Sequence, residues 1–270
     1  MIFLFKYFYI NQFRRDTPNI KYLLYQAITT LFSVWVYYMT AKSLTVRADG
    51  ELNWYGFDYF HFLIIGEAAM LLPHAAMESH SKVVRLLMHV HLKKELLRNS
   101  LMMNLKKLWV LSTAQTNTVW LQFLFYVFSA ALFQSQIQVQ NLVMGMAYVI
   151  LFIPCFMILG HGFGGLVLMT GRGQGITEQL MFLLQVLAGV YFPIEVFGNW
   201  AVNLKLYLPH TFFLNGIRQV MAGEFSSQIW IEALQFQIVF TLVFSPISIF
   251  IFHLARSRVK KNSEPQIIFS

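Results

Sequence analysis

Charged residues are scarce in this chain. Asp, Glu, Lys and Arg make up 12% of its 270 residues, and hydrophobic residues make up 57%. A soluble domain has about 25% charged residues, so this composition cannot cover a water-exposed surface, and lipid must solvate much of the protein. The chain has one cysteine, Cys155, which excludes a disulfide framework and a cysteine-based metal cluster.

Sequence motifs for nucleotide binding and metal catalysis are also missing. The stretch GRGQGIT at 171–177 lacks the Lys-Ser/Thr pair of a phosphate-binding loop and follows an apolar tract rather than a strand, so it indicates a turn. In the stretch GHGFGG, Gly160 and Gly164 have the spacing of close helix contacts in membranes. His89 and His91 lack the i, i+4 spacing of a metal pair, and the sequence has no HExxH motif.

Long runs without charge dominate the chain. Residues 22–41 carry no charge, and neither do residues 108–171, a tract divided by the polar stretch SQIQVQN. A helix needs about 20 apolar residues to cross the hydrocarbon core. The runs therefore predict an all-α membrane protein with six transmembrane helices, in a single transmembrane domain that covers residues 1–270. The expected spans are residues 22–41, 57–76, 113–133, 142–168, 176–193 and 232–254.

The basic residues are distributed unevenly about these spans. Six spans place both termini on one side of the membrane, and that side holds sixteen of the twenty Lys and Arg residues. By the positive-inside rule, both termini are cytoplasmic. This topology accounts for the net charge of +8, so a nucleic-acid partner is not needed to explain it.

The N-terminal segment, residues 1–20, is apolar, but a lysine interrupts it and no small-residue cleavage site follows, so it is not a secretory signal. Its residues Ile2, Phe5, Tyr9 and Phe13 fall at helical spacing beside basic residues. We expect an interfacial helix here; a frayed apolar tail is the alternative.

Glycine and proline recur between the fifth and sixth expected spans. Backbone that turns at membrane depth needs such residues at the turns, and it needs polar groups to satisfy the freed backbone atoms. We therefore expect residues 194–230 to form a pair of short helices that re-enter the outer leaflet. The residues that carry this pattern are Gly189, Pro193, Trp200, Leu208, Pro209, Thr211, Gly216 and Arg218.

The same segment resembles the end of the ABC-2 type transporter permease family. There a Gly-x-x-x-Pro segment, a Trp, a Leu-Pro-x-Thr and a Gly-x-Arg precede the last span in this order, as they do here. The resemblance implies a separate ATPase subunit that binds ATP and Mg, with no cofactor in this chain. It also implies export of drugs, lipids, lipid-linked glycans or peptides across the cytoplasmic membrane of a prokaryote. Because six spans are few to enclose a pathway, we expect a homodimer or a heterodimer with a related permease.

The expected cytoplasmic loop, residues 74–112, alternates apolar and basic residues at helical spacing. In the family a docking element similar to Glu-x-x-x-Gly-Thr-Leu-Glu contacts the ATPase. The nearest match lacks the Gly, the Thr and the last Glu, and it assigns coupling to Glu95, Arg98, Asn99, Ser100, Leu101 and Met102. A short helix there would dock in a groove of the ATPase. The alternative is a basic amphipathic helix that lies on anionic lipid.

Glu67 lies inside the second expected span, where a charge costs about 3 kcal/mol or more. It could line the translocation path or bind a cationic group of the substrate; a protonated or hydrogen-bonded Glu that ties helices together is the alternative. His161, Gln122 and Gln185 are expected to pack or to form interhelical hydrogen bonds. Two rival functions are a membrane-embedded lipid-modifying enzyme that uses Glu67 and His161 as acid and base, and a passive assembly subunit.

Overall fold

The computed structural model describes most of the chain as helices. The described residues are 20–45, 59–88, 109, 112, 119–120, 122–129, 132–133, 138–171, 174–194, 198, 200, 203 and 207–267. The long helices within them are α2 (Ile20–Thr45), α3 (Tyr59–Leu87), α6 (Val139–Thr170), α7 (Gln174–Ala188), α9 (Pro209–Met221) and α10 (Ser227–Ile267). No strand occurs in this described part of the chain, in agreement with the all-α prediction. The expected interfacial helix lies outside it, as does most of the expected cytoplasmic loop.

Three of the helices are long and apolar enough to cross a membrane. The qualifying stretches are Tyr59–Arg85 of α3, Val139–Thr170 of α6 and Ser227–Lys261 of α10. Helix α2 is also long, but its Tyr, Thr, Ser and Gln side chains make it less apolar. The apolar part of α7, Glu178–Ala188, is shorter than a span. By length and composition, the described residues therefore give three of the six expected spans.

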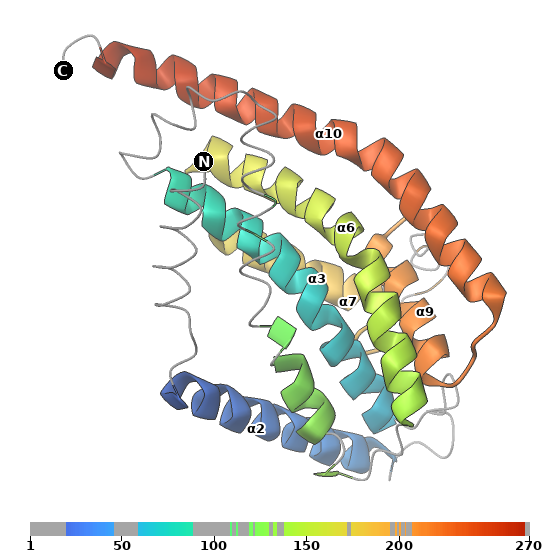
Figure 1. Cartoon of the computed structure of the whole chain (residues 1–270). Coiled ribbons are helices and arrows are strands. Elements are labelled where there is room, and N and C mark those ends of the chain that lie inside the picture. Colours follow the sequence, from blue (N-terminus) through green and yellow to red (C-terminus); the bar gives the residue numbers. More distant parts are fainter. Residues whose placement is uncertain are drawn as a thin grey trace.

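The three long helices pack side by side, with α6 between α3 and α10 (Figure 1). Glycines of α6 permit this close packing: a Cβ at Gly160 would lie 2.5 Å from His80 Nδ1 of α3, and a Cβ at Gly165 would lie 2.9 Å from Ile251 Cγ2 of α10. Gly164 also faces α3, where its nearest neighbour is Val84. The packing role expected for Gly160 and Gly164 is thus confirmed.

Helix α9 packs against α3 and α6 at the end of the bundle where α3 begins, and α2 extends away at an angle to the bundle (Figure 1). Aromatic rings connect α9 and α10: Phe212 of α9 stacks on Phe236 of α10 with ring centroids 4.3 Å apart. Within α10, Phe240 stacks on Phe244 at 4.2 Å. Such ring pairs add to the stabilisation from buried apolar area.

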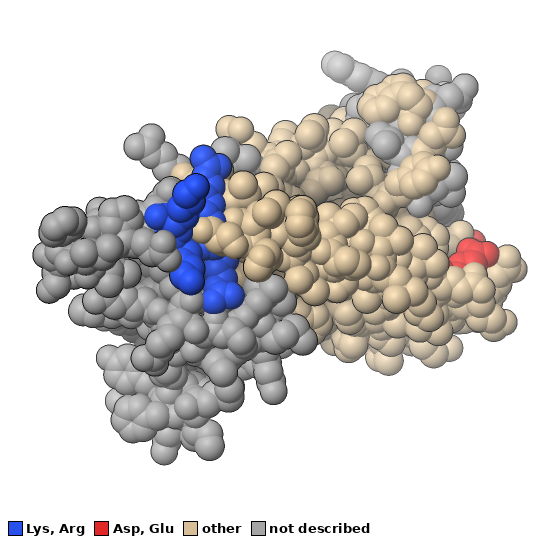
Figure 2. Space-filling model, turned by 90° about the horizontal axis from the view of Figure 1, so that it is seen from above, with Lys and Arg blue, Asp and Glu red and all other residues tan. Residues whose placement is uncertain are grey.

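Basic residues gather at one end of the described helices. Figure 2 shows Lys and Arg clustered at one end of a face that is otherwise free of charge over most of its described surface, with acidic residues at the opposite end. Near their C-terminal ends, α3 carries Lys82 and Arg85, and α10 carries Arg256, Arg258, Lys260 and Lys261. Helix α10 has 41 residues and is therefore about 62 Å long, about twice the hydrocarbon thickness.

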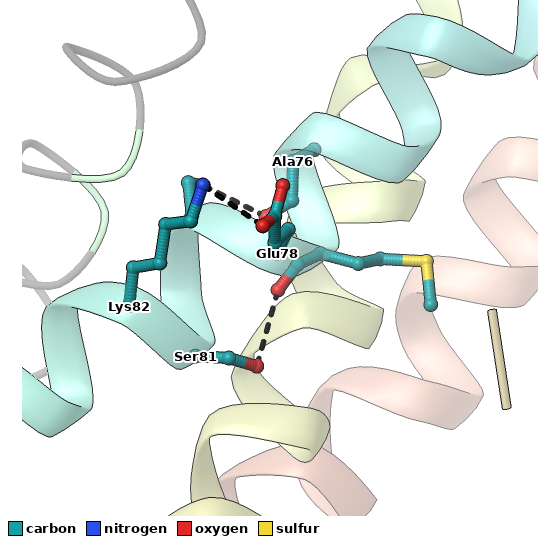
Figure 3. Close-up of polar contacts among 6 residues, drawn as sticks. Ala76, Glu78, Ser81 and Lys82 are labelled. Atoms are coloured by element: carbon teal, nitrogen blue, oxygen red, sulfur yellow. Dashed lines mark hydrogen bonds and ion pairs between the residues drawn. The ribbon is translucent and has the colours of Figure 1, made fainter. Parts of the chain in front are cut away.

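Helix α3 does not end near Pro73, where the second span was expected to end. The helix continues to Leu87 with Pro73 inside it, so the first part of the expected cytoplasmic loop is helical. Beyond the proline, Lys82 Nζ pairs with a Glu78 carboxylate oxygen at 2.8 Å, and Ser81 Oγ donates to the Met77 carbonyl at 3.4 Å (Figure 3). A proline removes one helical hydrogen bond, and the packing of α3 against α6 on both sides of Pro73 outweighs that loss.

Candidate functional site

Helix α7 ends in a sharp turn that leads toward α9. The N–H of Gly189 donates to the Val186 carbonyl at 3.1 Å, and the N–H of Val190 donates to the Gln185 carbonyl at 3.3 Å. This pair of bonds is a Schellman C-cap, which needs a left-handed residue directly after the helix. Gly189 supplies it with φ of +83°, a conformation that glycine adopts without steric cost. The sequence-based expectation that the backbone turns at Gly189 is confirmed.

Side chains from α3 and α9 hold the carbonyl groups of this turn. Thr211 Oγ1 donates to the Leu187 carbonyl at 3.4 Å, and Tyr59 Oη donates to the Tyr191 carbonyl at 3.0 Å. Arg218 Nη2 donates to the carbonyl of Val190 at 3.2 Å. Backbone groups freed at a helix end must find such partners when water is excluded. The turn is therefore fixed to two other helices through its own carbonyls.

Arg218 is the most buried charged side chain of this region, with 1% of its surface exposed. Its guanidinium carbon lies 3.5 Å from the centroid of the Phe62 ring, and Nη2 also donates to the Phe62 carbonyl at 3.3 Å. Cation–π contact of this kind is strongest in a desolvated setting. Gly66 makes room for it, because a Cβ there would lie 3.0 Å from both Arg218 Nη2 and the Val190 carbonyl oxygen.

The other residues of the expected re-entrant segment divide into two groups. Pro209 occupies the start of α9, directly after the extended N-cap Leu208, where a proline costs no helical hydrogen bond. Gly216 lets α9 approach α6, since a Cβ there would come within 1.9 Å of Tyr148 Oη. Pro193 is buried beside the turn. Trp200, by contrast, is 57% exposed and does not join this cluster.

Glu67 lies one residue beyond Gly66 and faces three tyrosines. Tyr37 on α2 and Tyr191 in the turn lie close enough for their hydroxyls to interact with its carboxyl group. Tyr126 lies close enough to interact with Glu67 electrostatically. The carboxyl oxygen Oε1 is buried and has no hydrogen-bond partner among the described residues. A carboxyl group in a helix of membrane length is thus surrounded by neutral phenols drawn from three separate segments.

Polar contacts continue along α2 from this cluster. Tyr126 lies close to Ser33 of α2, and Gln122 Nε2 donates to Gln26 Oε1. Gln185 and His74 form another interhelical contact, with Gln185 Nε2 3.3 Å from His74 Nδ1. The interhelical hydrogen bonds expected of Gln122 and Gln185 are confirmed.

His161 lies far from Glu67. Its ring is 4.4 Å from that of His80, centroid to centroid, and its Nδ1 lies 2.8 Å from the Met157 carbonyl of its own helix. His80 is thirteen residues beyond Glu67 on α3, which is about 20 Å along the helix axis. The two side chains that an acid–base enzyme would need are therefore not brought together.

The predicted coupling residues Glu95, Arg98, Asn99, Ser100, Leu101 and Met102 lie outside the described residues. Sequence reasoning missed Phe62, Gly66 and the three tyrosines around Glu67. Gly66 carried a usable signal, because a glycine inside a spanning helix often marks a close contact. The tyrosines carried none, since aromatic residues in apolar segments are also typical of membrane interfaces.

Comparison with known proteins adds no relative. No protein-family model, no curated protein and no solved structure matches the chain.

Proposed function

We propose that this chain is the permease subunit of an ATP-binding-cassette exporter in the cytoplasmic membrane of a prokaryote. Both termini lie in the cytoplasm, and two permeases, as a homodimer or as a heterodimer with a related chain, form the pathway. Separate ATPase subunits bind ATP and Mg and drive export of an amphipathic or lipid-like substrate. The residue pattern from Gly189 to Arg218 is the basis for this family assignment.

One observation carries the proposal. Thr211, Arg218 and the turn at Gly189 belong to that pattern, and in the structure both side chains donate to backbone carbonyls at the end of α7 and in the turn that follows it. Helix α7 has 15 residues and is about 22 Å long, which is shorter than a 30 Å hydrocarbon core. Under the proposal the turn lies at membrane depth. There, irregular backbone requires protein partners, and α3 and α9 supply them.

The charge distribution supports the orientation. The basic ends of α3 and α10 lie together (Figure 2), and a membrane protein keeps such clusters in the cytoplasm. The turn and Glu67 then belong to the outer half of the membrane. Glu67, with its buried unpartnered oxygen, is the proposed polar element of the pathway. Membrane lipids contact the exposed apolar faces of α2 and α10.

The test is co-purification with an ATPase subunit, followed by measurement of transport and ATP hydrolysis in lipid nanodiscs and vesicles. Replacing residues 95–102 with a Gly-Ser segment of the same length should lower substrate-stimulated hydrolysis by about tenfold or more, a coupling loss of about 1.4 kcal/mol. The double variant Lys260→Ala/Lys261→Ala on α10 serves as the control, because it removes basic charge from the same side. Absence of any ATPase partner, or unchanged hydrolysis after the loop replacement, would contradict the proposal.

A further inference from the structure

We propose that Glu67 and the tyrosines around it form a binding site for an organic cation, such as the ammonium headgroup of an amphipathic molecule. The assignment of this ligand as transported cargo rests on the proposed function, whereas binding itself does not. Four half-buried side chains define the site: Glu67 on α3, Tyr37 on α2, Tyr126 in the helical segment 122–129, and Tyr191 in the turn after α7.

The carboxyl group has unused capacity to accept hydrogen bonds. Its contacts with Tyr37 and Tyr191 come from neutral hydroxyls, and Oε1 is buried with no hydrogen-bond partner among the described residues. A buried polar atom without a partner is costly, and a carboxylate in a membrane helix is costlier still. A ligand that carries a positive charge would offset the cost of the carboxylate charge.

The aromatic walls favour an organic cation in particular. Tyrosine rings attract ammonium groups through their negative faces, and several rings around one acidic group are a known means of recognising alkylated ammonium. The rings of Tyr37, Tyr126 and Tyr191 all pack against the same apolar cluster beside the start of α3. Each of these tyrosines is partly exposed, which leaves the rings open to a ligand from outside the helix bundle.

Apolar surface adjoins the site and suits the rest of an amphipathic ligand. Exposed apolar side chains flank two of the tyrosines: Val36 precedes Tyr37 on α2, and Phe192 follows Tyr191 in the turn. The hydrocarbon part of the ligand would follow this surface into the lipid.

An inorganic cation fits the site less well. Calcium takes six to eight oxygen ligands and magnesium demands an octahedral set. Here the described oxygen ligands would be one carboxyl group and neutral phenol hydroxyls. The competing structural role is a protonated Glu67 that ties α2 to α3 through the phenols and binds nothing.

The experiment measures binding of tritiated tetraphenylphosphonium to the full chain in lipid nanodiscs. Tetraphenylborate, an anion of the same shape, is the matched ligand control. We expect saturable binding of the cation, and weakening of about tenfold in Glu67→Gln, the loss of one charge-assisted contact of about 1.4 kcal/mol. Glu224→Gln, which removes an exposed acidic charge, should bind as the unmodified chain does.

Two substitutions at Tyr126 distinguish a contact of the ligand with the ring from a contact with the hydroxyl. Tyr126→Phe keeps the ring and should retain affinity for the cation, whereas Tyr126→Ala should weaken it several-fold. Equal binding of the two ligands, or an unchanged affinity in Glu67→Gln, would overturn the inference. The binding assay needs no ATPase. If the chain binds the cation but no ATPase subunit co-purifies with it, only the proposed function is refuted. If the complex carries out ATP-driven transport but the Glu67→Gln variant binds the cation as tightly as the unmodified chain, only the proposed cation site is refuted.

Discussion

Arg218 offers the most direct test of how the turn after α7 is held. Replacing it with alanine removes the contact with the Phe62 ring and the hydrogen bond to the Val190 carbonyl. It also removes the hydrogen bond from α9 to the Phe62 carbonyl of α3, and it leaves the bond from Thr211 to the Leu187 carbonyl. We expect the Arg218→Ala variant to fold less stably and to lose the fixed geometry of the turn.

The magnitude follows from the separate contacts. A buried carbonyl that loses its donor costs about 1–3 kcal/mol, and a desolvated cation–π contact is worth about 2 kcal/mol. Relief from burying the guanidinium charge offsets part of this loss, which leaves a net cost of about 2–4 kcal/mol. For a chain of this size the cost lowers Tm by roughly 5–10 °C.

Thermal unfolding in detergent, followed by tryptophan fluorescence, measures the effect. Arg218→Lys keeps the charge but not the planar, stacking guanidinium, so its Tm should fall between those of the wild type and Arg218→Ala. Arg258→Ala, at an exposed position on α10, should change stability by no more than about 0.5 kcal/mol. Equal Tm values for Arg218→Ala and Arg258→Ala would refute the reasoning.

Three glycines yield further predictions in the same assay. Gly189→Ala should cost about 1 kcal/mol or more, because φ of +83° strains any residue with a Cβ. Gly175→Ala in the first turn of α7, where a Cβ meets nothing within 4 Å, should be neutral or slightly stabilising; similar losses at both positions would contradict the assigned strain. Gly216→Ala should cost about 1–3 kcal/mol through overpacking against Tyr148 Oη. An unchanged Tm in that variant would show that α6 and α9 do not pack as closely as described.

The proposed role of the turn connects stability with transport. Tyr191 belongs to the turn and lies beside Glu67, while the neighbouring Val190 carbonyl accepts a hydrogen bond from Arg218. A shift of α9 would therefore move one wall of the proposed cation site. Changes at Arg218 are expected to alter cation affinity as well as Tm, although Arg218 itself does not contact the ligand.

The sequence alone determined the features that depend on composition and on single residues. The charge-free tracts predicted α6 and α10 because few charged residues can lie within hydrocarbon. The conformational freedom of glycine predicted a turn at Gly189. The four-residue spacing of Gly160 and Gly164 predicted close helix packing. These properties act locally or along one helix, so the order of residues is sufficient to predict them.

Only the tertiary structure decided which residues meet. Pro73 was expected near the end of a helix, yet packing of α3 against α6 carries that helix on to Leu87. One partner of each of Arg218 and Glu67, Phe62 and Tyr191 respectively, comes from more than a hundred residues away. An apolar side chain has the same hydropathy whether it faces lipid or a neighbouring helix, so hydropathy cannot predict these pairings. They are fixed by shape and by the need to satisfy each buried polar group once the helices have packed.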